Sequence, residues 1–475
     1  MSVTRYTLSA LLAASALVGC LSDCKPATPR AASASAPSAA RAPANIPPSA
    51  TGDVAQAGAD SANAGSATAA PPPLTPPDAP EAEQRQALAQ AASSAWAYVK
   101  RNYSPASGLV KTHETYDYAT MWDVASSLAS YYSARELGLL SQADYEARTR
   151  KALATISQMA LYDGSAYNKL YDARTGDMVD RQTRKTTHGY GWSAVDLGRL
   201  LTWLKIVSAH DAQFEPMARE IVSRLATNQI VRGGYLYGRD LDPSTGQQQD
   251  YVEGRMGYEQ YAAAGFAAWG YRAEHALDFT TNEKLVSVDG VQVPADKRGD
   301  DLLTSDPFVM MGMEMGWPTA SWRENARRVF DAQFARYKKT GIVTMVGEDA
   351  LPEPPAYFYY YVLYRNGAPF SVISATGAPA PEHVRWVSAK AAFGWYALLP
   401  SEYAWLAVQT VRPASSASRG WMAGVFENSK ANTRSFNLNT SAVVLEAALY
   451  AQRRCPFIQV SCAAPAGAGS STAQR

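Results

Sequence analysis

Six times along this chain, a short extended stretch that is rich in glycine or aromatic residues and carries a carboxylate or amide runs into an apolar helical stretch. The six units are Tyr118–Gly138, Gly189–Val207, Gly254–Tyr271, Ser305–Gly316, Val387–Leu399 and Phe436–Tyr450. Most follow a helical stretch with a more charged surface, namely Glu81–Tyr103, Ser141–Leu161, Phe214–Asn228, Ser321–Lys338 and Ser401–Val411. Helix pairs that repeat in this way cannot bury their apolar faces singly, so neighbouring pairs must stack.

The economical stack of six helix pairs is a closed ring, so the sequence predicts an all-α fold, an (α/α)6 toroid of paired helices. The inner helices would start at one end, and the polar groups beside their first turns would meet at one mouth. Ser141 with Asp144, and Ser321 with Glu324, have the spacing of a capping box at a helix start. Gly341 follows its helix as a C-terminal stop.

Short β-hairpins are predicted on the rim of the ring. Lys169–Asp172, Gly234–Tyr237 and Tyr359–Tyr364 all alternate or run apolar before a turn signal. The fourth helical unit is the weakest, because the stretch from 274 to 303 shows no convincing outer helix. Asp289 and Gly290 lie there between two valine-rich stretches, which suggests a further hairpin.

The first residues have the features of an export signal. Arg5 precedes an apolar run from Leu8 to Val18, which is too short to span a bilayer. The run ends in Leu-Val-Gly-Cys20, which resembles the bacterial lipobox and implies cleavage before Cys20 and lipidation of its thiol. Because Leu21 follows, we expect a lipid-anchored protein of the cell envelope, in the outer membrane and facing the periplasm. The alternative, an ordinary secretory signal, also exports the chain.

The domain organisation follows from composition. Residues 1–20 are the signal peptide, and residues 21–80 form an Ala/Pro/Ser tether that lacks the apolar side chains needed to offset the entropy of ordering. Residues 81–462 form the helical domain, and residues 463–475 are a second disordered segment. Cys455 and Cys462 are close enough in sequence for a short-loop disulfide in an oxidising periplasm, with free thiols as the alternative.

Charge and composition restrict the partners. A net charge of +1 provides no field for steering onto nucleic acid. The aromatic content of 11% fits either sugar stacking or the filling of helix interfaces. The five histidines are scattered, so we expect no metal site and no cofactor. The predicted partner is a polysaccharide or oligosaccharide, and the protein is expected to be a monomer.

The first two units supply polar groups for the mouth. Asp123 lies in the opening turn of a helix, where the backbone dipole favours its ionised form, and Trp122 beside it offers a stacking face. Trp192, Asp196 and Arg199 recur at spacings of four and three residues, hence on one helix face, which predicts a buried or mouth-facing Asp–Arg pair. A catalytic Asp123 and an ordinary N-terminal helix aspartate are both open, as are a substrate contact and a structural ion pair.

The third unit is the densest in candidate groups. Glu253 lies in the extended lead-in, and Glu259 lies on the helix beyond two glycines that would let a ligand approach the backbone. Tyr258 lies next to Glu259. A glutamate among aromatic and apolar groups can have a raised pKa, as a general acid requires. The alternative for both glutamates is a structural hydrogen bond.

Later units add further candidates beside helix starts or on the rim, namely Asp306, Glu348, Asp349, Lys390, Trp395 and Asn437. Two carboxylates across one mouth are the minimum for glycoside hydrolysis, one as acid and one as base or nucleophile. We assign the catalytic role to Glu253, Asp123, Glu259 and Glu348. The substrate contacts are assigned to Trp122, Trp192, Asp196, Arg199, Tyr258, Asp306, Asp349, Lys390, Trp395 and Asn437.

At these residues the chain resembles the bacterial family called domain of unknown function 3131. The matching runs are Tyr118–Asp123, Gly191–Arg199, Glu253–Glu259, Gly347–Ala350 and Lys390–Trp395. The resemblance covers roughly 84 to 454 and implies an (α/α)6 toroid similar to glycoamylase-like and endo-β-1,2-glucanase glycoside hydrolases. It implies no assigned reaction. In the family pattern a glutamate usually stands at the position of Asp306, which makes Asp306 a weaker candidate for the acid.

Three functions of different classes fit these features. The first is hydrolysis or transglycosylation of a bacterial glucan or exopolysaccharide, with Glu253 as proton donor and Asp123 as base or nucleophile. The second is a polysaccharide lyase, which would favour a more basic mouth. The third is a non-catalytic polysaccharide-binding or export-assembly protein.

Overall fold

The computed structural model describes residues 73–242, 244–299, 302–352, 357–365, 368–375 and 377–462. The predicted signal peptide, Cys20, most of the predicted tether and the segment from Ala463 lie outside the described residues. The last part of the predicted tether is described, and Leu74 and Ala79 there pack against the hydrophobic core. Within the described part of the chain, no helix combines the length and the apolar character needed to cross a membrane.

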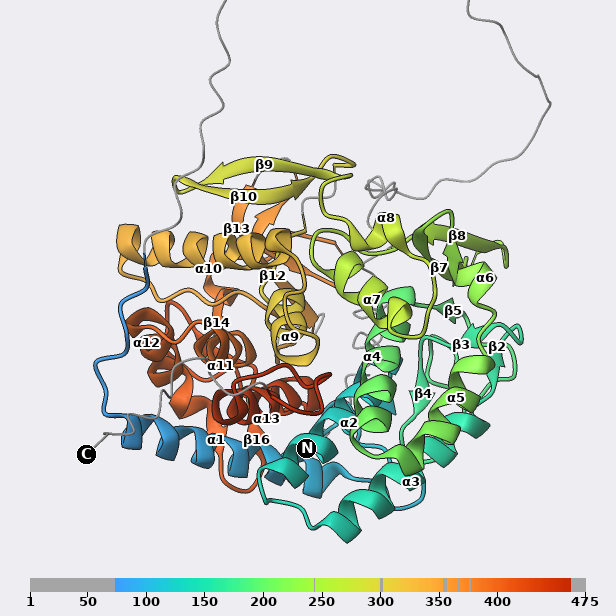
Figure 1. Cartoon of the computed structure of the whole chain (residues 1–475). Helices are drawn as coiled ribbons and strands as arrows, with labels where there is room; N and C mark the ends of the chain where they lie inside the picture. Colours follow the sequence, from blue (N-terminus) through green and yellow to red (C-terminus); the bar gives the residue numbers. More distant parts are fainter. Residues whose placement is uncertain are drawn as a thin grey trace, which may run out of the picture. The chain divides into compact units, whose positions relative to one another are not determined.

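The six predicted apolar units each form a helix that is buried over most of its length. These helices are α2 (Met121–Glu136), α4 (Ala194–His210), α7 (Tyr258–Ala267), α9 (Asp306–Glu314), α11 (Ala389–Leu398) and α13 (Leu438–Arg453). Each packs against the next in this order, and α13 packs against α2. Figure 1 shows α9, α11 and α13 beside one another. Residues from all six helices belong to one continuous hydrophobic core.

The more charged stretches form a second set of helices, in addition to these six. They are α1 (Glu81–Asn102), α3 (Gln142–Gln158), α5 (Glu215–Ser223), α10 (Ala320–Thr340) and α12 (Glu402–Val411). The fourth pair differs, as predicted, since α8 (Glu274–Leu277) is a single turn that precedes a hairpin. A further short helix, α6 (Thr227–Ile230), follows α5.

Two predicted caps are present and one is wrong. The Ser141 side chain accepts a hydrogen bond from the Asp144 N–H, and Gly341 ends α10 with a φ of 72°. Thr319, not Ser321, caps α10, because its side chain accepts from the Trp322 N–H. The helix therefore starts before Ser321, and the spacing of Ser321 and Glu324 falls inside it.

Strands form small antiparallel sheets around the helices. The hairpins are β7 (Tyr235–Leu241) with β8 (Gln248–Val252), β9 (Glu283–Val288) with β10 (Val291–Asp296), and β12 (Tyr357–Tyr364) with β13 (Ala368–Ser374). The β9–β10 hairpin lies above α10 in Figure 1. A third strand, β11 (Glu348–Ala350), joins the edge of β12.

The remaining strands are short. They are β1 (Tyr118–Ala119), β2 (Leu161–Tyr162), β3 (Ala166–Tyr167), β4 (Tyr171–Asp172), β5 (Gly191–Trp192), β6 (Val231–Arg232), β14 (Trp386–Ser388), β15 (Ser415–Ser416), β16 (Gly420–Trp421) and β17 (Gly424–Phe426). Of these, β5 and β6 pair with β7, and the others form separate two-stranded sheets, β1 with β4, β2 with β3, β14 with β17 and β15 with β16. Several of them, including β1, β5 and β14, lead directly into the apolar helices. The prediction of a helix-rich body with short β-hairpins is therefore confirmed, with hairpins at the predicted positions 234–237, 289–290 and 359–364.

Candidate active site

The starts of the apolar helices carry a connected set of polar groups. The N-cap residues of four of them, Thr120, Ser193, Ser388 and Asn437, each accept a hydrogen bond from the third backbone N–H of the helix. Such caps satisfy donors that have no partner inside the helix. They fix the first turns, and the side chains on those turns contact one another across helices.

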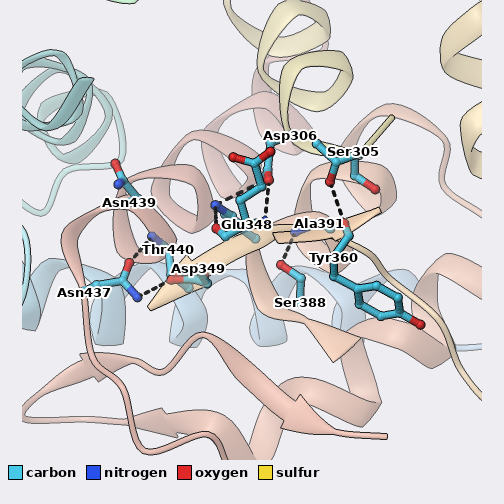
Figure 2. Close-up of polar contacts among 12 residues, drawn as sticks. Ser305, Asp306, Glu348, Asp349, Tyr360, Ser388, Ala391, Asn437, Asn439 and Thr440 are labelled. Atoms are coloured by element: carbon cyan, nitrogen blue, oxygen red, sulfur yellow. Dashed lines mark hydrogen bonds and ion pairs between the residues drawn. The ribbon is translucent and has the colours of Figure 1, made fainter. Parts of the chain in front are cut away.

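The centre of this set is a carboxylate pair with a buried lysine. Asp306, in the first turn of α9, accepts a hydrogen bond from the Glu348 N–H at 2.8 Å through Oδ2. Its Oδ1 lies 3.2 Å from Lys390 Nζ, which comes from the first turn of α11. Lys390 also donates to the Glu348 carbonyl. Figure 2 shows Asp306 pointing towards Glu348, which lies on β11.

Gly347 lets these three segments come together. A Cβ at this position would lie 2.7 Å from Ser388 Oγ and 3.5 Å from Asp306 Oδ2. Any side chain there would push β11 away from the starts of α9 and α11. The run Gly347–Ala350 is therefore a packing requirement as well as a carrier of two carboxylates.

Glu348 has a strongly perturbed acidity. Burial, followed by the negative charge of Asp306, raises the pKa of Glu348 to about 8, although Lys390 acts in the opposite direction. Its Oε1 atom is buried and has no hydrogen-bond partner among the described residues. The side chain is thus protonated at neutral pH, which is the form that a general acid needs.

A group of tyrosines surrounds Glu348. They are Tyr258, Tyr357, Tyr359 and Tyr361, and after burial the charge of Glu348 is the largest cause that raises the pKa of each phenol. Three of them alternate along β12, so they share one face of that strand. Tyr359 and Tyr361 stack with ring centroids 5.9 Å apart.

Asp349 is held on the other side of β11. Its Oδ1 accepts from Asn437 Nδ2 and its Oδ2 accepts from Thr440 Oγ1, both at 2.7 Å. Figure 2 shows Asn437, Asp349 and Thr440 together at the start of α13. Burial raises the pKa of Asp349 to about 6 despite Lys390 and Thr440. Asp349 is therefore mainly ionised at neutral pH, unlike its neighbour Glu348.

Asp123 has a full set of partners. Its Oδ2 accepts from Thr112 Oγ1 at 2.6 Å and from the Thr120 N–H at 2.9 Å, and its Oδ1 accepts from Asn439 Nδ2 at 3.1 Å. Asp123 lies in the first turn of α2, as predicted, and forms a complete capping box with Thr120. Burial raises the pKa of Asp123, and these hydrogen bonds oppose that change. The geometry gives Asp123 a structural role that joins α2 to α13.

Glu253 and Asp196 form a second carboxylate pair. Glu253 Oε2 accepts from the Ala194 N–H at the start of α4, while Oε1 is buried without a hydrogen-bond partner among the described residues. Asp196 lies in the first turn of the same helix. Burial and then the charge of Glu253 raise the pKa of Asp196 well above its usual value. Lys169 acts in the opposite direction on both carboxyls.

Tyr359 lies within electrostatic reach of a carboxyl from each of the two pairs. After burial, the charges of Glu348 and then Asp196 raise the pKa of its phenol. Glu348 and Asp196 also keep the most exposure among the candidate carboxylates, at 6% and 5%, against 2% or less for Asp123, Glu253, Glu259, Asp306 and Asp349. They are the least buried of the candidate carboxylate residues.

The predicted Asp196–Arg199 pair is wrong. Arg199 is fully buried and its Nη2 instead lies 3.1 Å from Glu446 Oε1 and 3.4 Å from Glu314 Oε1. These glutamates come from α13 and α9, because the interior of the helix array lies on the Arg199 side of α4. Asp196 instead interacts with the charges of Glu253, Asp123 and Lys169.

Three other candidates pack within the body. Glu259 forms an ion pair with Arg298, which also binds Asp296 and so fixes the β9–β10 hairpin to α7. Trp192 and Trp395 are fully buried. The Trp192 indole donates to the Tyr237 carbonyl, and Trp395 packs against Phe330. These two tryptophans have no ring face open to a sugar.

Gly257, one of the two glycines before Glu259, also has a packing role. A Cβ there would lie 2.7 Å from Pro307 and 2.9 Å from Phe308. The predicted approach of a ligand at Gly257 is therefore wrong, because the start of α9 occupies that space.

Sequence reasoning missed several residues of the site. Lys169, Asn439 and Thr440 were not selected, and the β12 tyrosines were interpreted only as a strand. A signal for the tyrosines was present, since positions 357, 359 and 361 alternate soon after two adjacent carboxylates. No group of three or more His, Cys, Asp or Glu residues in the described ranges has an arrangement suited to a metal ion.

The family model of DUF3131, protein of unknown function, matches residues 90–454. The chain belongs to the DUF3131 family. No curated protein matches it.

Solved structures share the fold of this DUF3131 protein at low identity. An endo-β-1,2-glucanase from Chitinophaga pinensis, solved with sophorotriose and glucose, is 13% identical with a TM-score of 0.56, covering 79% of this chain and 96% of that one. A candidate glucoamylase from Bacteroides caccae is 13% identical with a TM-score of 0.57, covering 79% and 94%. An endo-β-1,2-glucanase from Talaromyces funiculosus, solved with β-1,2-glucan, is 11% identical with a TM-score of 0.53, covering 78% and 86%. The body therefore has a helix-rich, glycoside hydrolase-like fold.

Proposed function

We propose that this DUF3131 protein is a glycoside hydrolase or transglycosylase that acts on a bacterial glucan or exopolysaccharide. The observation that carries the proposal is the presence of two pairs of carboxyl groups near the starts of the apolar helices. One pair is Asp306 and Glu348 beside Lys390, and the other is Asp196 and Glu253 near Lys169. We also propose that the six apolar helices form the inner ring of an (α/α)6 toroid. The contact of α13 with α2 and the glucanase-like fold support this arrangement.

Glu348 is the proposed proton donor. Its pKa of about 8 keeps it protonated at neutral pH, and Asp306, paired with Lys390, supplies the neighbouring negative charge that helps to raise it. A protonated carboxyl in this state can give its proton to the leaving glycosidic oxygen. After transfer, Lys390 would stabilise the new carboxylate through its positive charge.

The Asp196–Glu253 pair is the proposed proton acceptor. Burial raises the pKa of both carboxyls, and the charge of Glu253 raises the pKa of Asp196 further, so Glu253 is the member that carries the negative charge more readily. Lys169 and the start of α4 stabilise this charge. Glu253, whose Oε1 atom has no hydrogen-bond partner among the described residues, would take the proton from the attacking water, with Asp196 beside it. This assignment keeps Glu253 in the mechanism but moves the donor role to Glu348.

The test is release of reducing ends from β-1,2-glucan, laminarin and a panel of bacterial exopolysaccharides by purified protein. Wild-type turnover that falls at least about 100-fold in Glu348→Gln and Glu253→Gln supports the proposal. Glu402→Gln, a change at an exposed residue in the first turn of α12, is the matched control. Full activity in Glu348→Gln removes that residue from the mechanism.

The same assay distinguishes the other functions. Binding of a polysaccharide without turnover, by folded protein, would identify a binding or export-assembly protein. Products that absorb in the ultraviolet would identify a lyase.

We also propose that a lipid on Cys20 anchors the protein in the cell envelope, in the outer membrane and facing the periplasm. The lipobox-like sequence before Cys20 supports this location. Metabolic labelling with a radioactive fatty acid should mark the wild type and not Cys20→Ser. Equal labelling of both proteins would refute lipidation at Cys20.

A further inference from the structure

Trp122 is an aromatic residue of the site with partial solvent exposure. It lies in the first turn of α2, next to Asp123. Its ring makes edge contacts with Tyr258 and Tyr261, with centroids 5.8 and 5.9 Å away. Tyr258 is in turn one of the tyrosines around Glu348. Trp122 therefore lies close to the proposed donor and differs from the fully buried Trp192 and Trp395.

The backbone of Trp122 is fixed from two sides. Asp123 and Thr120 form the capping box at the start of α2. The single hydroxyl hydrogen of Ser126 is shared between two acceptors, the Trp122 carbonyl at 3.1 Å and Asn439 Oδ1 at 2.8 Å. These bonds hold the first turn of α2 against α13. The backbone at Trp122 is therefore fixed and does not fray as an uncapped helix end would.

Arg199 fixes the ring itself. Its guanidinium carbon lies 4.6 Å from the centroid of the Trp122 ring, over one face. Arg199 has no exposed surface and is held by Glu314 and Glu446, while the Tyr261 hydroxyl donates to Glu314. The guanidinium thus covers one face of the indole with a charge that cannot reach a substrate.

We propose that Trp122 is a stacking platform for an uncharged pyranose and that Arg199 is the positioning residue that sets its orientation. This inference rests on the proposed carbohydrate-active function and specifies its substrate class. A pyranose stacks its apolar C–H face on an aromatic ring, and a ring held rigidly before binding loses less freedom when the sugar arrives. Of the two lysines at the site, Lys390 is paired with Asp306 and Lys169 lies 3.4 Å from Asp240, so a uronate would meet lysines that are already neutralised.

The experiment labels the protein with 5-fluorotryptophan and follows fluorine NMR, with the Trp122 signal assigned from Trp122→Phe. The probes are β-1,2-glucan oligosaccharides and laminari-oligosaccharides, with oligogalacturonate as the charged comparison. We expect a neutral oligosaccharide to shift the Trp122 signal. Trp122→Ala should weaken its binding at least about tenfold. Arg199→Lys keeps the charge but loses the flat stacking group, and should broaden the Trp122 signal and raise KM about three- to tenfold with little change in kcat.

Trp269 provides the matched control. It is a second tryptophan with a cation over its ring, Lys205 at 5.1 Å, and both residues lie near the opposite ends of α4 and α7 from the site. Trp269→Phe and Lys205→Met should leave sugar affinity unchanged. Arg199→Met serves as a second variant, and its thermal unfolding separates a folding defect from a loss of orientation.

Three outcomes overturn the inference. They are binding of a neutral sugar without a change in the Trp122 signal, binding of none of the neutral probes, and a narrow, unshifted Trp122 signal with normal KM in folded Arg199→Lys. Failure of the proposed function has a different signature. In that case neutral sugars still shift the Trp122 signal, but the wild type releases no reducing ends.

Discussion

The two ends of the apolar helices differ in the kind of side chains that they bury. At their starts lie carboxylates, lysines and tyrosines from several segments. At the far end, Phe457 is fully buried and packs against Tyr132, Trp203 and Tyr450. The backbone N–H groups of Phe457 and Ile458 donate to the Met313 and Glu314 carbonyls at the end of α9.

The difference shows how stability and chemistry are divided within one helix array. A disulfide joins Cys455 and Cys462, so the segment that covers the far end is closed covalently. That end buries apolar surface, which is favourable. The site end buries charges, which costs free energy unless they are paired. Variants at the two ends should therefore have opposite phenotypes.

The largest expected effect is on catalysis. Glu348→Gln removes the proposed transferable proton and should lower kcat by about 100- to 10,000-fold, as for loss of a general acid. The thermal unfolding midpoint should stay the same or rise near neutral pH, since a neutral amide replaces a buried titratable group. Parallel kinetics and calorimetry on the variant check this. A variant with markedly lower stability and normal kcat would show that Glu348 stabilises the fold and does not take part in catalysis.

The second effect is the pH dependence of stability. The folded pKa of Glu348, about 8, lies above the unfolded value of about 4.3, so the folded protein binds this proton more tightly. The contribution is fully present below about pH 4 and is lost as pH rises through about 8. At 1.36 kcal/mol per unit, the upper bound is on the order of 5 kcal/mol.

Denaturant unfolding from pH 5 to pH 9 measures this dependence. The wild type should lose stability relative to Glu348→Gln as pH rises. Parallel curves for the two proteins would show that Glu348 is not the titrating group.

At the opposite end, Phe457→Ala should act on stability alone. Loss of a fully buried phenylalanine leaves a cavity among the aromatic rings and should cost about 3–5 kcal/mol. Urea unfolding gives the stability, and kcat at a temperature where the variant stays folded should equal that of the wild type. A large fall in kcat for the folded variant would show that the two ends are coupled.

The smallest expected effect comes from the disulfide. Replacement of both Cys455 and Cys462 by serine opens a short loop, for which loss of about 2–3 kcal/mol is expected from chain entropy. A reducing agent should lower the free energy of unfolding of the wild type by the same amount as the double substitution. It should leave the free energy of unfolding of the double variant unchanged. If the reductant has no effect on the wild type, the bridge does not contribute to stability.

The repeating helix pattern could be predicted from sequence because apolar periodicity and caps are local. The hairpin at Asp289-Gly290 and the weak fourth pair followed from the same kind of signal. The partners of Arg199 could not be predicted, since Glu314 and Glu446 are more than a hundred residues away. Nor could the difference between Glu348 and Asp349, because it depends on which face of β11 meets Asp306 and which meets α13.

The last helix, α13, provides contacts that the first helices of the chain need. Helix α13 packs against both α1 and α2, and its start supplies Asn437, Asn439 and Thr440 to the carboxylates of distant segments. A chain that stops short of α13 would leave Asp123 and Asp349 without these partners and would expose an apolar side of α2. Folding of the body therefore requires the final residues, and C-terminally shortened products should be inactive and prone to aggregation.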